Sequence, residues 1–133
     1  MRHRMAGKRQ GRSTSHRRAM RRNFICSVIK HERVVTTVER AKALRRSVEK
    51  VITLGKQKDL SRIRRAMALL GDKEVVRKLF DELGPRYKDR PGGYTRTLRL
   101  SGYRIGDGGS KAIFELVDNS VLENQLAQAT AEA

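Results

Sequence analysis

Four stretches of the chain repeat apolar residues three or four positions apart, which is the spacing of an amphipathic helix. The clearest stripe runs from Val38 through Leu44 and Val48 to Ile52, with charged residues on the remaining positions. These patterns predict four helices, over about residues 15–32, 38–55, 60–70 and 73–83.

The ends of these stretches carry residues that favour helix termini. Side-chain oxygens that can cap helix N-termini are expected at Ser15, Thr37 and Asp72. Gly55 and Gly71 suit a C-terminal cap, because glycine adopts the left-handed backbone conformation without strain. The pair Gly84-Pro85 should stop the fourth helix.

The remaining apolar segments alternate like β-strands. Residues 94–103 and 112–117 flank a glycine-rich turn and predict a hairpin, and residues 33–36 form a short segment that can add a third strand. Because two strands alone are marginally stable, we expect the third strand or a helical cover. The fold class is therefore α+β (α/β): a compact domain of about four helices with a small two- to three-stranded sheet.

Charge divides the chain into three regions. The first 22 residues hold nine Arg or Lys, two His and no acidic residue. So charged a segment buries too little apolar surface to offset its ordering entropy. We therefore expect a disordered basic arm over residues 1–14, a single α/β globular domain over residues 15–118, and a flexible tail over residues 119–133.

The overall net charge is +17, with 31 Lys plus Arg against 14 Asp plus Glu. Such an imbalance favours nucleic acid or another polyanion as the partner. Cys26 is the single cysteine, which excludes an intramolecular disulfide and suits a reducing compartment. No apolar run is long enough to span a membrane, and no signal-peptide pattern is present, so we expect a cytoplasmic protein with no membrane partner.

Residue patterns of catalysis are missing from the sequence. There is no phosphate-binding G-x-x-x-x-G-K-[ST] motif, and the three His and Cys26 lack zinc-ligand spacing. Asp81 and Glu82 are adjacent on a helix and so project in different directions, which does not suit an acid–base pair. We predict no catalytic residue, no metal, no cofactor and no small-molecule substrate, so the chain is not expected to be an enzyme.

Binding to RNA is the chemistry that the sequence does favour. Arginine forks recognise phosphate, and cations crowded at the start of the first helix suit an anion bound there. The basic residues are spread over an arm, two helices and a loop, which suits folded RNA read by shape. The predicted RNA-binding residues are Arg2, His3, Arg4, Lys8, Arg9, Arg12, His16, Arg17, Arg18, Arg21, Arg22, Arg45, Arg46, Arg90, Gly92, Gly93, Tyr94, Arg96 and Arg99.

Two alternatives remain open from the residues alone. Tyr94 can stack on a base or ribose of RNA, or it can be a core aromatic at the start of a strand. The whole protein can be an RNA-binding structural protein, or a DNA-coating, chromatin-like module with the same charge. Equal affinity for duplex DNA and folded RNA at matched salt would indicate the second.

Several motifs follow one another in a fixed order along the chain: Met1-Arg2-His3, Ser15-His16-Arg17, Arg40-Ala41-Lys42, Leu44-Arg45-Arg46, Leu83-Gly84-Pro85-Arg86-Tyr87 and Gly92-Gly93-Tyr94-Thr95-Arg96. With these motifs, residues 1–118 resemble the bacterial-type ribosomal protein number seventeen of the large subunit. The sequence departs from that pattern at Gly11, Ala43 and Gly55, and in the tail after Asp118.

The resemblance implies a compact α/β domain with a small sheet and a basic N-terminal extension. It implies contacts with large-subunit ribosomal RNA and with neighbouring large-subunit ribosomal proteins, near the side where the nascent peptide leaves. It implies a structural role without catalysis. The expected location is the ribosome in a bacterial cytoplasm, with an organellar ribosome as the alternative.

Overall fold

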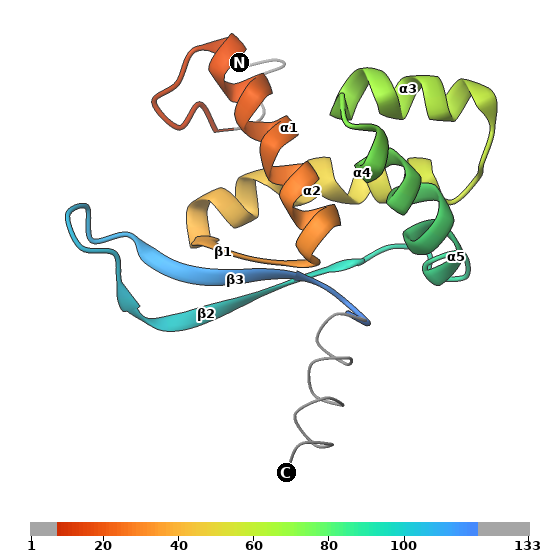
Figure 1. The fold of residues 1–133 in the computed structure, drawn as a ribbon. Coiled ribbons are helices and arrows are strands. Elements are labelled where there is room, and N and C mark those ends of the chain that lie inside the picture. Colours follow the sequence, from red (N-terminus) through yellow and green to blue (C-terminus); the bar gives the residue numbers. More distant parts are fainter. Residues whose placement is uncertain (1–7, 120–133) are drawn as a thin grey trace, which may run out of the picture.

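Helices pack on one face of a three-stranded antiparallel sheet with the strand order β1-β3-β2 (Figure 1). The computed structural model describes residues 8–119. The elements are α1 (Thr14–His31), β1 (Arg33–Thr37), α2 (Val38–Gly55), α3 (Leu60–Leu70), α4 (Lys73–Lys78), the π-helical segment η1 (Leu79–Leu83), α5 (Gly84–Arg86), β2 (Thr95–Tyr103) and β3 (Ser110–Leu116). The predicted α+β class is confirmed, and β1 supplies the third strand by pairing Val34 with Phe114.

The N-cap of helix α1 lies two residues earlier than the sequence predicts. Ser13, not Ser15, is the N-cap, and its hydroxyl accepts a hydrogen bond from the backbone N–H of His16 at 3.4 Å. Three hydroxyl residues stand in a row here, so the choice among them depends on the backbone leading into the helix. The helix ends at Glu32, which takes the left-handed conformation with φ of 57°.

Helix α2 ends at Gly55 as predicted, although Gly55 is not a left-handed cap, and the predicted stop at Gly84 is wrong. Gly55 is the last residue of α2 and is buried, and the helical path continues through Gly84 and Pro85 to Arg86. A Cβ on Gly84 would lie 2.5 Å from the carbonyl oxygen of Gly55. These glycines therefore permit two backbones to cross in contact, which is a tertiary requirement that local stop signals do not reveal. Gly71 does end α3 in the left-handed conformation, as predicted.

The core lies between the helices and the inner face of the sheet. Phe24 of α1 and Phe114 of β3 meet edge to face, with ring centroids 5.2 Å apart. Tyr87 and Tyr94 form a second aromatic pair at 5.3 Å. Val48 of α2 has no exposed surface, in agreement with its place on the predicted stripe.

Glu32 is a fully buried carboxylate at the junction of α1 and β1. Arg86 donates to both of its oxygens, at 2.7 and 3.2 Å, and the Lys78 ammonium lies 3.1 Å from Oε1. The backbone carbonyl of Glu32 also accepts from the N–H of Leu116 at 2.9 Å. Burial acts to raise the pKa of Glu32, but the bonds from Arg86 and Lys78 outweigh it and hold the pKa below its ordinary value.

We predict that Gly84→Ala lowers the free energy of unfolding by about 1–3 kcal/mol, because the new methyl group must displace the α2 backbone. Gly92→Ala is the matched control, since nothing lies within 4 Å of a Cβ there. Urea unfolding followed by circular dichroism measures both. Equal stability of the two variants would contradict the close crossing.

We predict that Glu32→Gln destabilises the fold at pH 7 by about 3 kcal/mol, because it leaves two partly buried cations without their anion. A depressed carboxyl pKa gives stability that is present above the ordinary pKa of 4.5 and is lost as pH falls through the folded-state value. The difference between wild type and Glu32→Gln should therefore shrink below about pH 4.5. Unfolding curves at pH 7, 5 and 3 test this, with the exposed Glu82→Gln as control. A difference that is the same at pH 3 and pH 7 would argue against the ion cluster.

Candidate nucleic-acid interface

The described part of the predicted arm, residues 8–13, folds back beside α2. Lys8 forms an exposed ion pair with Glu39, and Gln10 and Gly11 make a turn with positive φ angles of 55° and 61°. Arg9 is exposed. The predicted contacts Arg2, His3 and Arg4 lie outside the described residues, as does most of the predicted tail.

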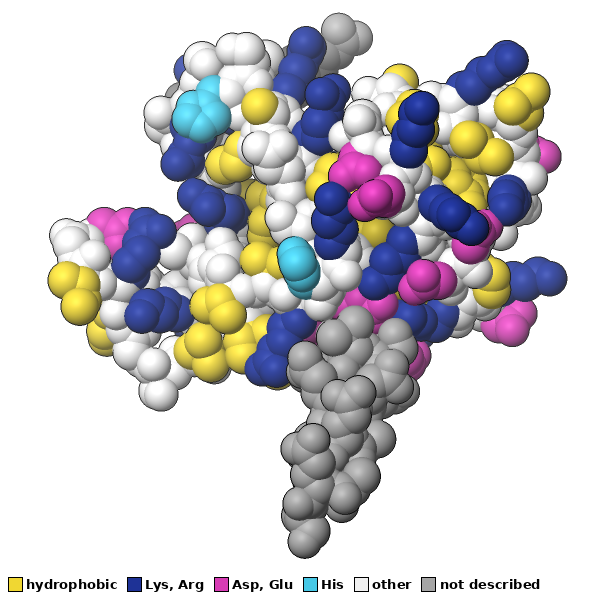
Figure 2. Space-filling view, in the orientation of Figure 1, with side chains coloured by type: hydrophobic (Ala, Val, Ile, Leu, Met, Phe, Trp, Pro, Cys, Tyr) yellow, Lys and Arg dark blue, Asp and Glu magenta, His cyan; other side chains and the backbone are white. Residues whose placement is uncertain are grey.

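Cations gather at the first two turns of α1 without acidic side chains among them (Figure 2). Arg17 donates to the Arg12 carbonyl at 2.7 Å and to the Thr14 hydroxyl at 3.3 Å, which orders the entry to the helix. Arg18 and Arg21 are exposed, and neither pairs with a carboxylate within the described chain. His16 is also exposed. The first turn of α1 contains no acidic residue that would compete with a bound anion.

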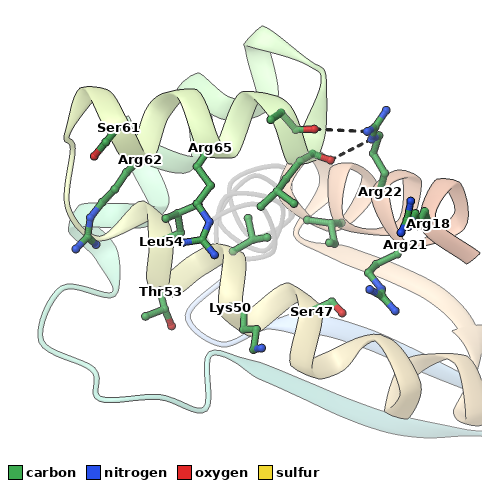
Figure 3. Close-up of a pocket in the computed structure, with 14 residues that line it drawn as sticks. Arg18, Arg21, Arg22, Ser47, Lys50, Thr53, Leu54, Ser61, Arg62 and Arg65 are labelled. Atoms are coloured by element: carbon green, nitrogen blue, oxygen red, sulfur yellow. Dashed lines mark hydrogen bonds between the residues drawn. The ribbon is translucent and has the colours of Figure 1, made fainter. Parts of the chain in front are cut away.

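A basic groove opens between α1, α2 and α3, with a volume of about 930 Å³. Its cations come from all three helices, and none of its lining residues is acidic. Figure 3 shows Arg65 of α3 extending toward α2 and Arg21 of α1 on the other side of the opening. The six cations that line this basic groove are Arg18, Arg21, Arg22, Lys50, Arg62 and Arg65.

Aliphatic side chains form the floor of the basic groove. Val51 and Leu54 of α2 lie beneath it, and Leu69 of α3 lines it while remaining 48 % exposed. Serine and threonine hydroxyls from α2 and α3 line it as well. The groove thus combines apolar surface with cations, a combination that suits a nucleotide better than a simple anion.

Arg22 closes one end of the basic groove. Its Nε donates to the Leu69 carbonyl at 3.0 Å, and an NH2 group reaches the Ala68 carbonyl at 3.5 Å (Figure 3). These carbonyls belong to the last turn of α3, where helix oxygens lack intrahelical partners. Arg22 therefore holds α1 against α3, and its role includes structure as well as charge.

The two predicted RNA contacts on α2 differ in whether they form an ion pair within the described chain. Arg45 pairs with Glu49 four residues later, at 3.0 Å, whereas Arg46 is exposed without an ion-pair partner within residues 8–119. Neither lines the basic groove. Exposed pairs of this kind contribute little to stability, so both side chains can be redirected to another partner.

Tyr94 is a core residue, and the structure favours that alternative over stacking on RNA. Its ring is 2 % exposed, packs against Tyr87, and has the Lys56 ammonium 4.8 Å from its centroid. Its hydroxyl donates to the Arg90 carbonyl at 3.3 Å. A base has no access to this ring. Of the two alternatives that the sequence left open, the burial of Tyr94 therefore favours the core role.

The loop before Tyr94 remains at the surface. Gly93 is exposed with φ of 67°, and Gly92 is half-buried with open space around it. Arg90 pairs with Asp118 at 3.2 Å. Arg99 on β2 is exposed, and within the described residues it has no ion-pair partner.

Arg96 neutralises a buried carboxylate of the neighbouring strand. Glu115 is 2 % exposed and accepts from Arg96 Nε and NH2 at 2.8 and 2.6 Å. Arg33 lies across β3 from Arg96, with its Nε 3.8 Å from the second oxygen. Arg96 is therefore held by the sheet, in contrast to the unpaired Arg99.

Within residues 8–119 no group of three or more His, Cys, Asp or Glu is arranged to hold a metal ion. Burial raises the pKa of the Cys26 thiol, which lies 3.7 Å from the Leu70 carbonyl, so the thiol is neutral. No described helix is long and apolar enough to cross a membrane.

Comparison with known proteins places this basic domain in a family. Residues 20–117 match the family described as Ribosomal protein L17. The chain belongs to the Ribosomal protein L17 family. This agrees with the resemblance carried by the motifs along the sequence.

Relatives in this family cover nearly the whole chain. A protein of Trichlorobacter lovleyi named "Large ribosomal subunit protein bL17" is 52% identical over 120 residues, which are 90% of this chain and 96% of the relative. The protein of the same name from Magnetococcus marinus is 55% identical over 119 residues, or 89% and 94% of the two chains. That of Geobacter metallireducens is 49% identical over all 133 residues and 74% of its own length.

Within this L17 domain, the sequence analysis missed three of the six cations that line the basic groove. Lys50, Arg62 and Arg65 line it but were not among the predicted contacts. They lie on two helices whose sequences carry many cations, so no local motif marks them. The positions of α2 and α3 that line the groove include no acidic residue, and this absence could have marked them. The signal becomes usable only once it is known that these helices pack beside α1.

We predict that Arg96→Ala lowers the free energy of unfolding of this L17 domain by about 1–3 kcal/mol, because it removes both close hydrogen bonds from the buried Glu115. Arg99→Ala, on the same strand but exposed and unpaired within residues 8–119, should change stability by less than about 0.5 kcal/mol. Thermal unfolding of the two variants gives the comparison. Matching losses would show that Glu115 does not depend on Arg96.

Proposed function

We propose that the protein is a structural constituent of the large ribosomal subunit, which binds and stabilises ribosomal RNA through its basic arm and a basic domain face. The family and the names of its relatives support the ribosomal role. The physical support comes from the charges around α1. The proposal includes neighbouring large-subunit ribosomal proteins as partners and a bacterial ribosome in the cytoplasm as the location.

The observation that carries the proposal is the shortage of internal anions near the arm. Among the described residues 8–22, Lys8 alone has a carboxylate partner within the described chain. Elsewhere in the described chain most acidic residues pair with cations of the fold, as in the pairs Lys58–Asp81 and Lys30–Asp72. Cations left without internal partners are stabilised when phosphates supply the missing charge.

The arm contributes reach and the domain contributes position. The arm is proposed to lie along RNA, because its composition offers many cations and no core of its own. Helix α1 is anchored in the core by Phe24 and Val28, so it fixes where the arm enters the RNA. Arginine is suited to this task because its planar fork matches phosphate oxygens.

We predict that changing Arg2, Arg4, Arg9 and Arg12 together to Gln weakens binding to large-subunit ribosomal RNA fragments and reduces the salt dependence. Removing four phosphate contacts should lower the magnitude of the log–log salt slope by about 3, at 0.7–0.9 per contact. Filter binding from 50 to 300 mM KCl measures it.

The control for the arm variant removes the same number of charges from another face. Arg64, Lys73, Arg77 and Lys88 are exposed, lie outside the basic groove, and are changed together to Gln. Their loss should change the slope much less. Competition with duplex DNA at matched salt tests the DNA-coating alternative. Equal slopes for the two variants, or equal competition by DNA and RNA, would overturn the proposal.

A further inference from the structure

The basic groove between α1, α2 and α3 has more specific features than a charged surface. We propose that it binds one unpaired nucleotide turned out of an RNA helix, with the base on the apolar floor and the adjoining phosphates on the cationic rims. This inference rests on the proposed RNA-binding function and adds a ligand to it. It also adds Lys50, Arg62 and Arg65 to the interface.

The shape of the groove favours an extruded nucleotide over a duplex. Its volume of about 930 Å³ lies in the range of sites for small ligands, whereas an RNA helix presents a broad surface of phosphates and ribose. Leu54 and Leu69 line the opening and offer apolar contact to a group that enters it. An unpaired base has such an apolar face, and a paired base has its face covered by its neighbours.

The charges on the two sides suit the phosphates that flank such a base. Arg18 and Arg21 stand on the α1 side, and Arg65 stands on the α3 side, with Lys50 below. Within residues 8–119 none of these four has an ion-pair partner, so their charges are available. Arg62 is only loosely paired, with its Nε 3.8 Å from Asp59.

No aromatic residue lines the groove, so the base would contact aliphatic side chains and guanidinium planes. Hydroxyls of Ser47 and Ser61 offer polar partners to the ribose or the base edges. The Thr53 hydroxyl donates to the Glu49 carbonyl at 3.0 Å and is engaged within the fold. An acidic peptide is the competing occupant, but the groove continues the basic run of the arm along α1, which favours RNA.

Two RNA hairpins of equal length test the proposal, one fully paired and one with a single bulged adenosine. The full-length wild-type protein should bind the bulged hairpin about tenfold tighter, as expected for one base held on a side-chain surface. With 2-aminopurine in the bulge, fluorescence should change on binding. The double variant Lys50→Ala with Arg65→Ala should lose this preference.

Matched controls separate the groove from general charge. Lys42→Ala with Arg64→Ala removes one Lys and one Arg from the same helices at exposed positions outside the groove, and should keep the preference for the bulge. Leu69→Ser should lose the preference with an unchanged salt slope. Leu60→Ser, on the same helix and 64 % exposed, should keep it. Circular dichroism confirms that each variant is folded.

The outcomes distinguish this inference from the proposed function. No preference for the bulge in wild type, or equal losses in groove and control variants, would overturn the nucleotide site while arm-dependent RNA binding stands. Tighter binding of a poly-glutamate peptide than of the bulged hairpin would overturn it in favour of a peptide partner. Absence of salt-dependent binding to any RNA would overturn the proposed function itself.

Discussion

The fold depends on one buried anion, Glu32, at the junction of α1 and β1. Glu32 adopts a left-handed backbone conformation, with its N–H bound to the Val28 carbonyl and its carbonyl bound by Leu116. Its carboxylate meets Arg86 from α5 and Lys78 from α4. One residue thus connects α1, the sheet and the later helices. Lys78 adds a bond to the Lys30 carbonyl at 3.1 Å, so the C-terminus of α1 is held by the same cluster.

Paired carboxylates also explain where the positive charge remains available. Glu115 forms ion pairs with Arg33 and Arg96 on the sheet, and Asp72 forms an ion pair with Lys30 beside α4. None of the residues in these pairs lines the basic groove. In a chain of net charge +17, this distribution concentrates the uncompensated cations near α1 and the groove.

Local signals predicted most of the fold but not its close contacts. The bounds of α2 and α3 follow from an apolar stripe and, for α3, from Gly71, since these depend on nearby residues alone. The roles of Gly55 and Gly84 depend on a backbone crossing between segments far apart in sequence. A pattern of glycine followed by proline cannot distinguish a stop from such a crossing.

In the candidate site, too, local features could be predicted and features that depend on tertiary packing could not. The basic run at the start of α1 was evident because its cations are consecutive in sequence. Arg65 was missed because it lines the groove only after α3 has packed, while its neighbour Arg64 does not line it. Tyr94 was ambiguous because a strand-start aromatic can face either side. Its burial is decided by Tyr87, which comes from a different element.

Arg22 connects the basic run at the start of α1 to the end of α3, which lines the basic groove. It is the last cation of the basic run, yet its guanidinium is bound to the carbonyl end of α3. Cations at a helix C-terminus interact favourably with its exposed oxygens and its dipole. This bond sets the separation of α1 from α3 and keeps Arg18, one turn earlier, at the rim. A residue that reads as another phosphate contact in the sequence therefore shapes the site in which its neighbours act.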